Sequence, residues 1–288
     1  MAALALGGLF SAVAALYLAW RVSECALNLL LYNNRAFALR EIDVQTDGLI
    51  APEQLRRWSG VRLGQNLFAL DLMEVRRNLE MVSMIESVSL EKVLPHTLHL
   101  RVVEREPLAQ LSVPRPRARG GGFEFLPFYL DADAFVILPL SASQCSPAAQ
   151  TASNEQLPMI TGLNSNEVQA GRRMESPQVC AALNLILAFQ RSAMQGLADI
   201  KRVDVSAPEV LLVRTAQGAE ITFGLKDLDQ QVRRWQSIFD FGQRTHKAIA
   251  TLDLAVSNSI PATWVDAGAV PQISAKTPKP LRNKKKHV

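Results

Sequence analysis

Cysteine is scarce in this sequence, and its three cysteines lie far apart. Cys25, Cys145 and Cys180 form no Cys-x-x-Cys pair, so neither a zinc site nor a disulfide-rich framework is indicated. A single bridge between Cys145 and Cys180 would need an oxidising compartment, and the spacing alone leaves that pairing open. We therefore expect no metal ion and no cofactor.

The sequence also lacks the short motifs with which enzymes hold phosphates, nucleophiles or catalytic metals. It contains no Gly-x-Ser-x-Gly, no phosphate-binding loop and no His-Glu-x-x-His. The glycine run at 120–122 is not followed by the helix and lysine that phosphate binding requires. No catalytic residue is assigned, and we expect neither an enzyme nor a small-molecule substrate.

One stretch, residues 93–109, does bring possible catalytic side chains together. His96 and His99 are three positions apart, and that spacing within a strand points two side chains to opposite faces, which argues against a shared metal. Glu104 and Glu106 follow, where we expect a solvated strand end. A membrane-anchored hydrolase that uses His99 or Glu104 is the weakest functional alternative, because paired catalytic carboxylates need a cleft.

The folded part of the chain lacks an excess of positive charge. The net charge is +4, but residues 275–288 contain six Lys and Arg side chains and no acid. The high isoelectric point therefore belongs to a tail and indicates no nucleic-acid groove. From Ala267 onward the sequence is rich in proline and lysine, and we predict a disordered basic tail at 267–288.

Charge is absent altogether from residues 2–20. A run of this length is close to the roughly 20 residues that cross a bilayer as a helix, and Tyr17 and Trp20 suit the headgroup level. We predict a membrane anchor at 1–32. A cleaved signal peptide is the rival interpretation, but its small-residue site at 12–14 would interrupt the apolar run too early.

The orientation of that anchor stays open. Arg21, Arg35 and Arg40 follow the apolar run and no Lys or Arg precedes it, so the positive-inside rule alone places the body of the chain in the cytoplasm. Additional residues before Met1, lost through a misassigned start codon, would remove this argument.

Residues 37–112 contain the periodic pattern of a small α+β domain. The predicted order is strand, helix, helix, strand, strand, with two helices covering one sheet. Pro52 suits the first turn of a helix that stops at Gly60, and Asp71 suits the cap of the next. The elements are expected at 39–45, 51–60, 72–80, 85–93 and 98–104.

A Pro-, Arg- and Gly-rich stretch at 113–122 is predicted to be a linker loop. Residues 123–266 then alternate strands with two amphipathic helices, which begin near Pro177 and Asp227. This pattern predicts a mixed β-sheet domain with helices. We expect 249–258 to form its last strand.

Several segments together resemble the bacterial division protein family FtsQ, also called DivIB. They are "ALREIDV", "GQNLFALDLMEVRRNLE", "IESVSLEKVLPHTLHLRVVEREPLA", "LPMITG" and "TLDLAVSNSIPATW". The resemblance covers residues 1–265 in order, and its most specific part runs from Gly64 to Pro107. It implies a single-pass inner-membrane protein with a periplasmic POTRA domain (37–112) and a second β domain (123–266), without enzyme activity.

The resemblance also implies a partner and a binding site. Proteins of this family act at the division septum, bind the FtsB and FtsL coiled-coil proteins, and thereby help to control peptidoglycan synthesis by FtsW and FtsI. Carried onto this sequence, the FtsB-type contact is the addition of a partner strand to the last strand of the β domain. The residues implied are Thr251, Leu252, Asp253, Leu254, Ala255, Val256, Asn258, Ser259 and Trp264.

Two alternatives to this assignment remain. The strand could already be covered by its own chain, which would leave no free edge at 251–256. The protein could also be another POTRA-containing envelope protein of export or outer-membrane assembly, although no β-barrel sequence accompanies it.

Overall fold

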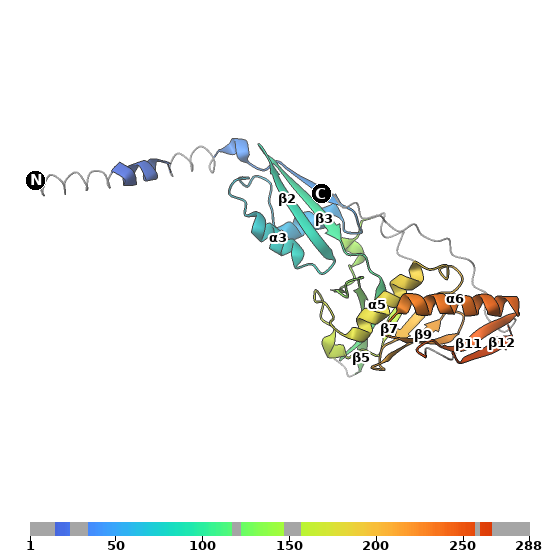
Figure 1. Cartoon of the computed structure of the whole chain (residues 1–288). Coiled ribbons are helices and arrows are strands. Elements are labelled where there is room, and N and C mark those ends of the chain that lie inside the picture. The colour runs from blue at the N-terminus through green and yellow to red at the C-terminus, as the bar shows by residue number, and fades with distance from the viewer. Residues whose placement is uncertain (1–14, 24–33, 117–121, 147–156, 257–259, 267–288) are drawn as a thin grey trace, which may run out of the picture. The chain divides into compact units, whose positions relative to one another are not determined.

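The computed structural model describes residues 15–23, 34–116, 122–146, 157–256 and 260–266 (Figure 1). The chain divides into two compact units. Unit 1 contains residues up to Glu104 together with Ser141–Ser153, and unit 2 contains Arg105–Leu140 and the residues from Asn154 onward.

Most of the predicted membrane anchor at 1–32 lies outside the described residues. Residues 15–23 form a helix. Within the described ranges, no helix is both long enough and apolar enough to cross a bilayer. The predicted basic tail at 267–288 also lies outside the described residues.

Unit 1 has the predicted order of strand, helix, helix, strand, strand. Its three-stranded sheet has the order β1-β3-β2, in which β1 runs parallel and β2 antiparallel to β3. A short 3-10 helix η2 precedes the sheet. The elements are η2 (Arg35–Phe37), β1 (Glu41–Thr46), α2 (Pro52–Ser59), α3 (Leu72–Glu80), β2 (Ile85–Val93) and β3 (Thr97–Glu104).

The helix boundaries in unit 1 follow from local chemistry that the sequence already displays. Pro52 lies in the first turn of α2, and Gly60 ends that helix in the left-handed conformation at φ 70°, which glycine adopts without a steric penalty. Asp71 caps α3, because its Oδ1 accepts a hydrogen bond of 2.8 Å from the backbone N of Met73.

The core of unit 1 lies between the sheet and the two helices. Alternate residues of β3, namely Leu98, Leu100 and Val102, are buried, as the period of a half-buried strand requires. The helices contribute Leu55 from α2 and Val75 and Leu79 from α3.

Glu104 corrects the prediction of a solvated strand end. It lies on the buried face of β3 and is only 9% exposed. Its carboxylate accepts hydrogen bonds from the backbone N of Leu49 at 2.6 Å, from the backbone N of Ile50 at 3.0 Å and from the hydroxyl of Thr46. A buried carboxylate satisfied by three donors holds the turn after β1 against the end of β3.

Unit 2 is built on a nine-stranded mixed sheet with the order β12-β11-β10-β9-β8-β7-β4-β5-β6. Its strands are β4 (Ala109–Pro116), β5 (Phe123–Leu130), β6 (Val136–Ile137), β7 (Met159–Thr161), β8 (Ile200–Asp204), β9 (Val210–Thr215), β10 (Glu220–Gly224), β11 (Lys247–Asp253) and β12 (Ala262–Asp266). Its helices are η4 (Ser165–Glu167), α5 (Pro177–Gln190) and α6 (Leu228–Arg244).

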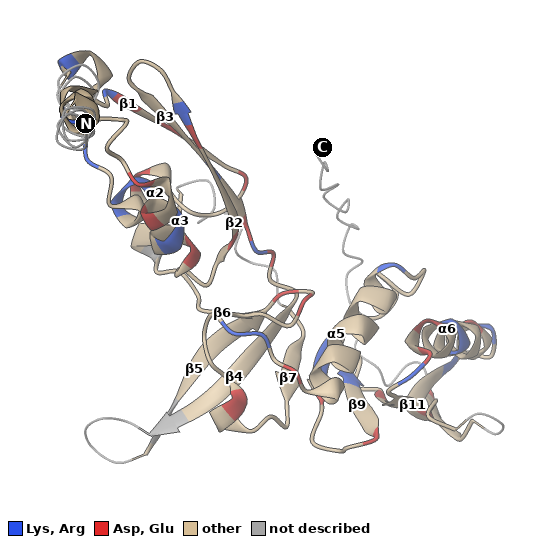
Figure 2. Cartoon of the chain, turned by 60° about the vertical axis from the view of Figure 1, so that its left-hand side comes forward, with Lys and Arg blue, Asp and Glu red and all other residues tan. Residues whose placement is uncertain are grey.

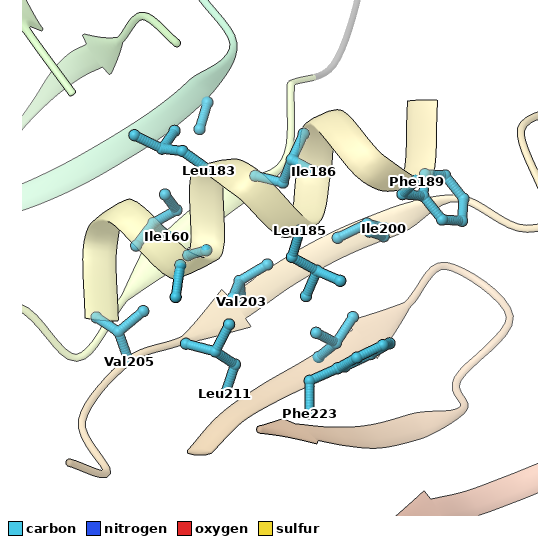
Figure 3. Close-up of a cluster of buried hydrophobic side chains, with 14 of the residues drawn as sticks. Ile160, Leu183, Leu185, Ile186, Phe189, Ile200, Val203, Val205, Leu211 and Phe223 are labelled. Atoms are coloured by element: carbon cyan, nitrogen blue, oxygen red, sulfur yellow. The ribbon is translucent and has the colours of Figure 1, made fainter. Parts of the chain in front are cut away.

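Helices α5 and α6 pack against one face of this sheet and against each other. Figure 3 shows Leu185 of α5 directed toward Val203, Leu211 and Phe223 of the sheet. Trp235 of α6 completes the core between Phe189, with ring centroids 5.4 Å apart, and Phe223, at 6.0 Å. Within the described residues, the opposite face of the central strands is exposed, as at Lys201, Leu212 and Arg214.

One expectation at the boundary of unit 2 needs correction. The predicted linker at 113–122 is wrong in its first part, since 113–116 belong to β4. Strand β6 contains only Val136 and Ile137. The polar segment after it carries the 3-10 helix η3 (Ala142–Gln144) and returns to unit 1, where Cys145 pairs with Ile50.

Candidate partner-binding edge

The strand predicted to end the sheet does not lie at its edge. Strand β11 contains the predicted residues Thr251, Leu252 and Asp253, and it pairs with β10 on one side and β12 on the other. The alternative in which the chain covers its own strand is therefore the one observed. The edge is formed by β12, five residues that sequence reasoning placed beyond the last strand.

Strand β12 has hydrogen-bonding groups that face away from the sheet. The backbone N of Asp253 donates to the carbonyl of Pro261 at 3.0 Å, so the carbonyl of Pro261 points toward β11. Successive residues of an antiparallel strand alternate in direction. The backbone N–H and C=O groups of Ala262 and Trp264 therefore point outward, where an added strand would meet them.

Trp264 fixes the edge strand to helix α6. Its ring lies 6.0 Å from that of Phe241 in an edge-on arrangement, and it occupies the space beside Gly242. Trp264 pairs with Ile249 of β11. The indole of Trp264 packs against the helix at Gly242, and this contact positions β12.

The opposite face of β12 is open. Thr263 lies next to Thr251, with their hydroxyl oxygens 2.6 Å apart. Val265 follows on the same face and is 40% exposed. An incoming strand would thus meet an exposed apolar side chain beside a polar threonine pair, in addition to the backbone groups.

The remaining predicted binding residues differ in accessibility. Leu252 and Leu254 are buried in the core of unit 2, so neither offers a side chain to a partner. The carboxylate of Asp253 accepts a hydrogen bond from the backbone N of Ala255. Val256 is exposed, and Asn258 and Ser259 lie outside the described residues.

Helix α6 adds exposed side chains beside this edge. Phe241, which contacts Trp264, is itself exposed, and Arg233, Asp240 and Arg244 are exposed along the same helix. Figure 2 shows charges of both signs along α6. The surface next to β12 therefore combines an exposed aromatic side chain with arginines, two residue types that are enriched at protein interfaces.

The histidines and glutamates of 93–109 do not come together in one cluster. His96 lies in the turn before β3, whereas His99 lies on the strand with its Nδ1 3.1 Å from Asp43. Glu104 is engaged by the turn after β1, and Glu106 is exposed. Within the ranges that the structure describes, no three His, Cys, Asp or Glu side chains are placed to hold a metal ion.

The two described cysteines are free thiols. Cys145 belongs to unit 1 and Cys180 to unit 2. Burial raises the pKa of the Cys145 thiol, and the nearby Glu104 carboxylate adds to the effect, so this thiol is held in its protonated, less reactive form.

Comparison with known protein families finds a match for unit 1. A family model described as "POTRA domain, FtsQ-type" matches residues 37–105, which coincide with the strand-helix-helix-strand-strand arrangement. The cell division protein FtsQ of Geotalea daltonii is 23% identical over 227 residues, covering 78% of this chain and 74% of that protein. The FtsQ of Syntrophotalea carbinolica is 23% identical over 216 residues, covering 75% and 70%.

Residues 37–105 thus match the FtsQ-type POTRA domain, and the chain is similar to FtsQ (DivIB) proteins over about three quarters of its length. A third relative, FtsQ of Corynebacterium glutamicum, is 28% identical over 136 residues, which cover 46% of this chain and 56% of that protein. The predicted resemblance to the FtsQ family is confirmed, and these relatives are named as cell division proteins. In this protein, the sequence prediction missed Ala262, Thr263 and Val265; Pro261, which begins a new extended segment, was the available signal.

Proposed function

We propose that this protein is a non-enzymatic scaffold of the division machinery. It binds a coiled-coil division protein of the FtsB/FtsL type by accepting a strand at β12, and through that complex it helps to control septal peptidoglycan synthesis by FtsW/FtsI-type enzymes. Its N-terminal segment, residues 1–32, anchors it in the inner membrane. Both folded units lie in the periplasm at the septum, with the POTRA domain nearest the membrane.

The observation that carries this proposal is the edge position of β12, which pairs with no strand other than β11 among the described residues. Strand addition needs unpaired N–H and C=O groups on a strand that is itself held in place. Ala262 and Trp264 supply those outward groups, and the packing of Trp264 on α6 holds the strand. An edge strand of this kind is otherwise a site for aggregation, which a dedicated partner strand would prevent.

The anchor is supported by the sequence rather than by the described helix. Residues 2–20 contain no charged side chain, and Arg21 marks the end of the run. The helix at 15–23 coincides with its final part. Extraction of the full chain from membranes tests this part of the proposal: alkaline carbonate should leave it in the membrane pellet, and release into the supernatant contradicts an integral anchor.

Two glutamate variants test the binding edge. Val265 and Leu212 are both exposed on strands of the same sheet, at 40% and 47%, but Leu212 lies on the interior strand β9. Val265→Glu should abolish co-purification of the FtsB/FtsL-type pair with the full chain, because it places a charge against the incoming strand. Leu212→Glu should leave co-purification intact.

Unimpaired co-purification with Val265→Glu, in a chain that retains the unfolding temperature of the wild type, would remove β12 as the binding site. Loss with both variants would point instead to the open face of the sheet. A fluorescent fusion tests the wider role: a band at midcell is expected, and an even signal around the envelope contradicts a septal scaffold.

A further inference from the structure

One end of unit 1 combines exposed leucines with exposed arginines. The segment before β1 lies between two turns, which its hydrogen bonds identify. On one side the backbone N of Leu39 donates to the carbonyl of Gln65 at 2.8 Å, and that of Gly64 donates to the carbonyl of Leu39 at 2.8 Å. On the other side the backbone N of Arg40 donates to the carbonyl of His96 at 2.9 Å. We call this region the N-terminal end of unit 1.

Both turns expose leucine at their tips. Leu63, in the turn before Gly64, is 65% exposed, and Leu94, in the turn between β2 and β3, is 55% exposed. Neither side chain belongs to the core cluster of unit 1. Leucine at a turn tip contributes nothing to the fold of the domain when it is this exposed, so two of them at one end indicate an external apolar contact.

Three arginines surround these leucines. Arg62 precedes Leu63, and Arg35 and Arg40 lie on the segment between the two turns; all three are exposed. The exposed carboxylate of Glu41 offsets one of them. Figure 2, with Lys and Arg in blue, shows the start of β1 and the β2–β3 turn at the same end of unit 1. The balance of charge at this end is positive.

The chain enters unit 1 at this same end. The carbonyl of Asn34 accepts a hydrogen bond from Nδ2 of Asn66 at 3.5 Å, and the side chain of Asn34 accepts one from the backbone N of Ala36 at 2.9 Å. Only the residues between Trp20 and Asn34 separate this point from the uncharged run. A tether this short keeps the leucines and arginines at high local concentration next to whatever surface holds the anchor.

We infer that the N-terminal end of unit 1 docks on the surface of a bilayer that contains anionic phospholipid. Leu63 and Leu94 enter the interface, where exposed apolar side chains are stabilised. Arg35, Arg40 and Arg62 contact the negatively charged headgroups, as basic clusters beside a membrane segment do. This inference rests on the proposed anchor and adds to it that the domain lies on the membrane rather than hanging free from it.

The test uses the full chain in nanodiscs with an environment-sensitive fluorophore, NBD, on a single cysteine. Cys25, Cys145 and Cys180 are replaced by alanine, and the label is placed by Leu94→Cys or, as the control, by Met81→Cys. Met81 is 78% exposed and lies just before β2, whose nine residues separate it from Leu94 by about 30 Å.

In nanodiscs of phosphatidylcholine with phosphatidylglycerol, NBD at position 94 should brighten and shift to shorter wavelength, and nitroxide-labelled lipids should quench it. The label at position 81 should keep the emission of a water-exposed probe. Arg40→Glu combined with Arg62→Glu should reverse the shift at position 94. In nanodiscs of phosphatidylcholine alone, the emission shift of NBD at position 94 should be smaller.

The possible failures are distinguishable. If the chain does not enter nanodiscs, the anchor of the proposed function is wrong and the docking inference falls with it. If it enters but the label at position 94 stays as hydrated as that at 81, the anchor stands and the docking is overturned. An equal shift with and without phosphatidylglycerol overturns the role assigned to the arginines.

Discussion

Gly242 of α6 and Trp264 of β12 lie so close that no side chain fits between them. A Cβ built on Gly242 would stand 2.7 Å from Cζ3 of Trp264 and 2.7 Å from the carbonyl oxygen of Lys247. The first neighbour is a side chain of the edge strand and the second is backbone at the start of β11. Absence of a side chain at Gly242 therefore sets the position of the candidate binding edge.

Gly242→Ala should destabilise unit 2 and displace β12. The steric conflict should cost about 1–3 kcal/mol, partly offset by about 1 kcal/mol from the better helix propensity of alanine. Urea unfolding measures the net change, and the emission of the tryptophans reports the displacement. Ser237→Ala, at an exposed position of the same helix, is the control and should change neither the free energy of unfolding nor the tryptophan emission. If Gly242→Ala also changes neither quantity, the contact with Trp264 does not position β12.

Glu104→Gln should lower the stability of unit 1. The amide nitrogen that it introduces cannot accept the hydrogen bonds now made by the backbone N–H groups of Leu49 and Ile50 and the hydroxyl of Thr46, so a buried donor is left unpaired. The expected loss is about 2–4 kcal/mol in the free energy of unfolding. Denaturant unfolding measures it, and Glu106→Gln at the neighbouring exposed position is the control.

The same pair of variants separates a structural Glu104 from a catalytic one. A structural role predicts that Glu104→Gln loses stability and that any defect in division follows that loss. Full stability with complete loss of function would instead support the hydrolase alternative.

Asp204 should make unit 2 less stable in acid. Hydrogen bonds from the hydroxyl and backbone N of Ser206 lower the pKa of this carboxyl, and a weaker one from Thr161 adds to the effect. A carboxyl whose pKa is lower in the folded state stabilises the fold above its unfolded pKa, about 3.9. That contribution is lost as the pH falls through the still lower folded pKa.

Thermal unfolding of the wild type and of Asp204→Asn between neutral pH and pH 2 measures this contribution. The wild type should lose stability more steeply with acid, and the curves should converge below the folded pKa. Ser206→Ala should flatten the wild-type dependence in part, because it removes the hydroxyl donor but leaves the backbone donor. Identical slopes in all three chains would contradict the assignment.

Proline at two adjacent positions of β12 should separate partner binding from stability. Ala262→Pro removes an N–H that points outward, and edge strands tolerate proline there. The affinity for the FtsB/FtsL-type pair should fall about threefold to tenfold, the value of one hydrogen bond. Thr263→Pro removes an N–H that points toward β11 and should instead destabilise the pairing of β11 with β12.

Isothermal calorimetry for binding and thermal unfolding for stability measure the two effects. If Ala262→Pro leaves the affinity unchanged, the partner strand does not pair with the outward backbone groups of β12. A drop in stability for Ala262→Pro as large as that for Thr263→Pro would show that the alternation inferred along β12 is wrong.

The sequence by itself determined the local elements of unit 1. Pro52, Gly60 and Asp71 set helix ends through interactions within a few residues, and alternation along 98–102 identified the buried face of β3. These features are predictable because their causes lie within one turn of helix or one strand. The order of elements in unit 1, together with quoted segments such as "GQNLFALDLMEVRRNLE", was enough to indicate the FtsQ family.

Only the tertiary structure decided which strand is the edge and what Glu104 does. Both depend on partners distant in the chain: β11 pairs with β10 and β12, and Glu104 reaches the turn at 46–50. Strand order in a sheet and the satisfaction of a buried carboxylate are set by non-local pairing, which no local period encodes. The candidate binding site therefore moved from 251–256 to 262–266, a short segment whose edge position is visible only after the sheet has assembled.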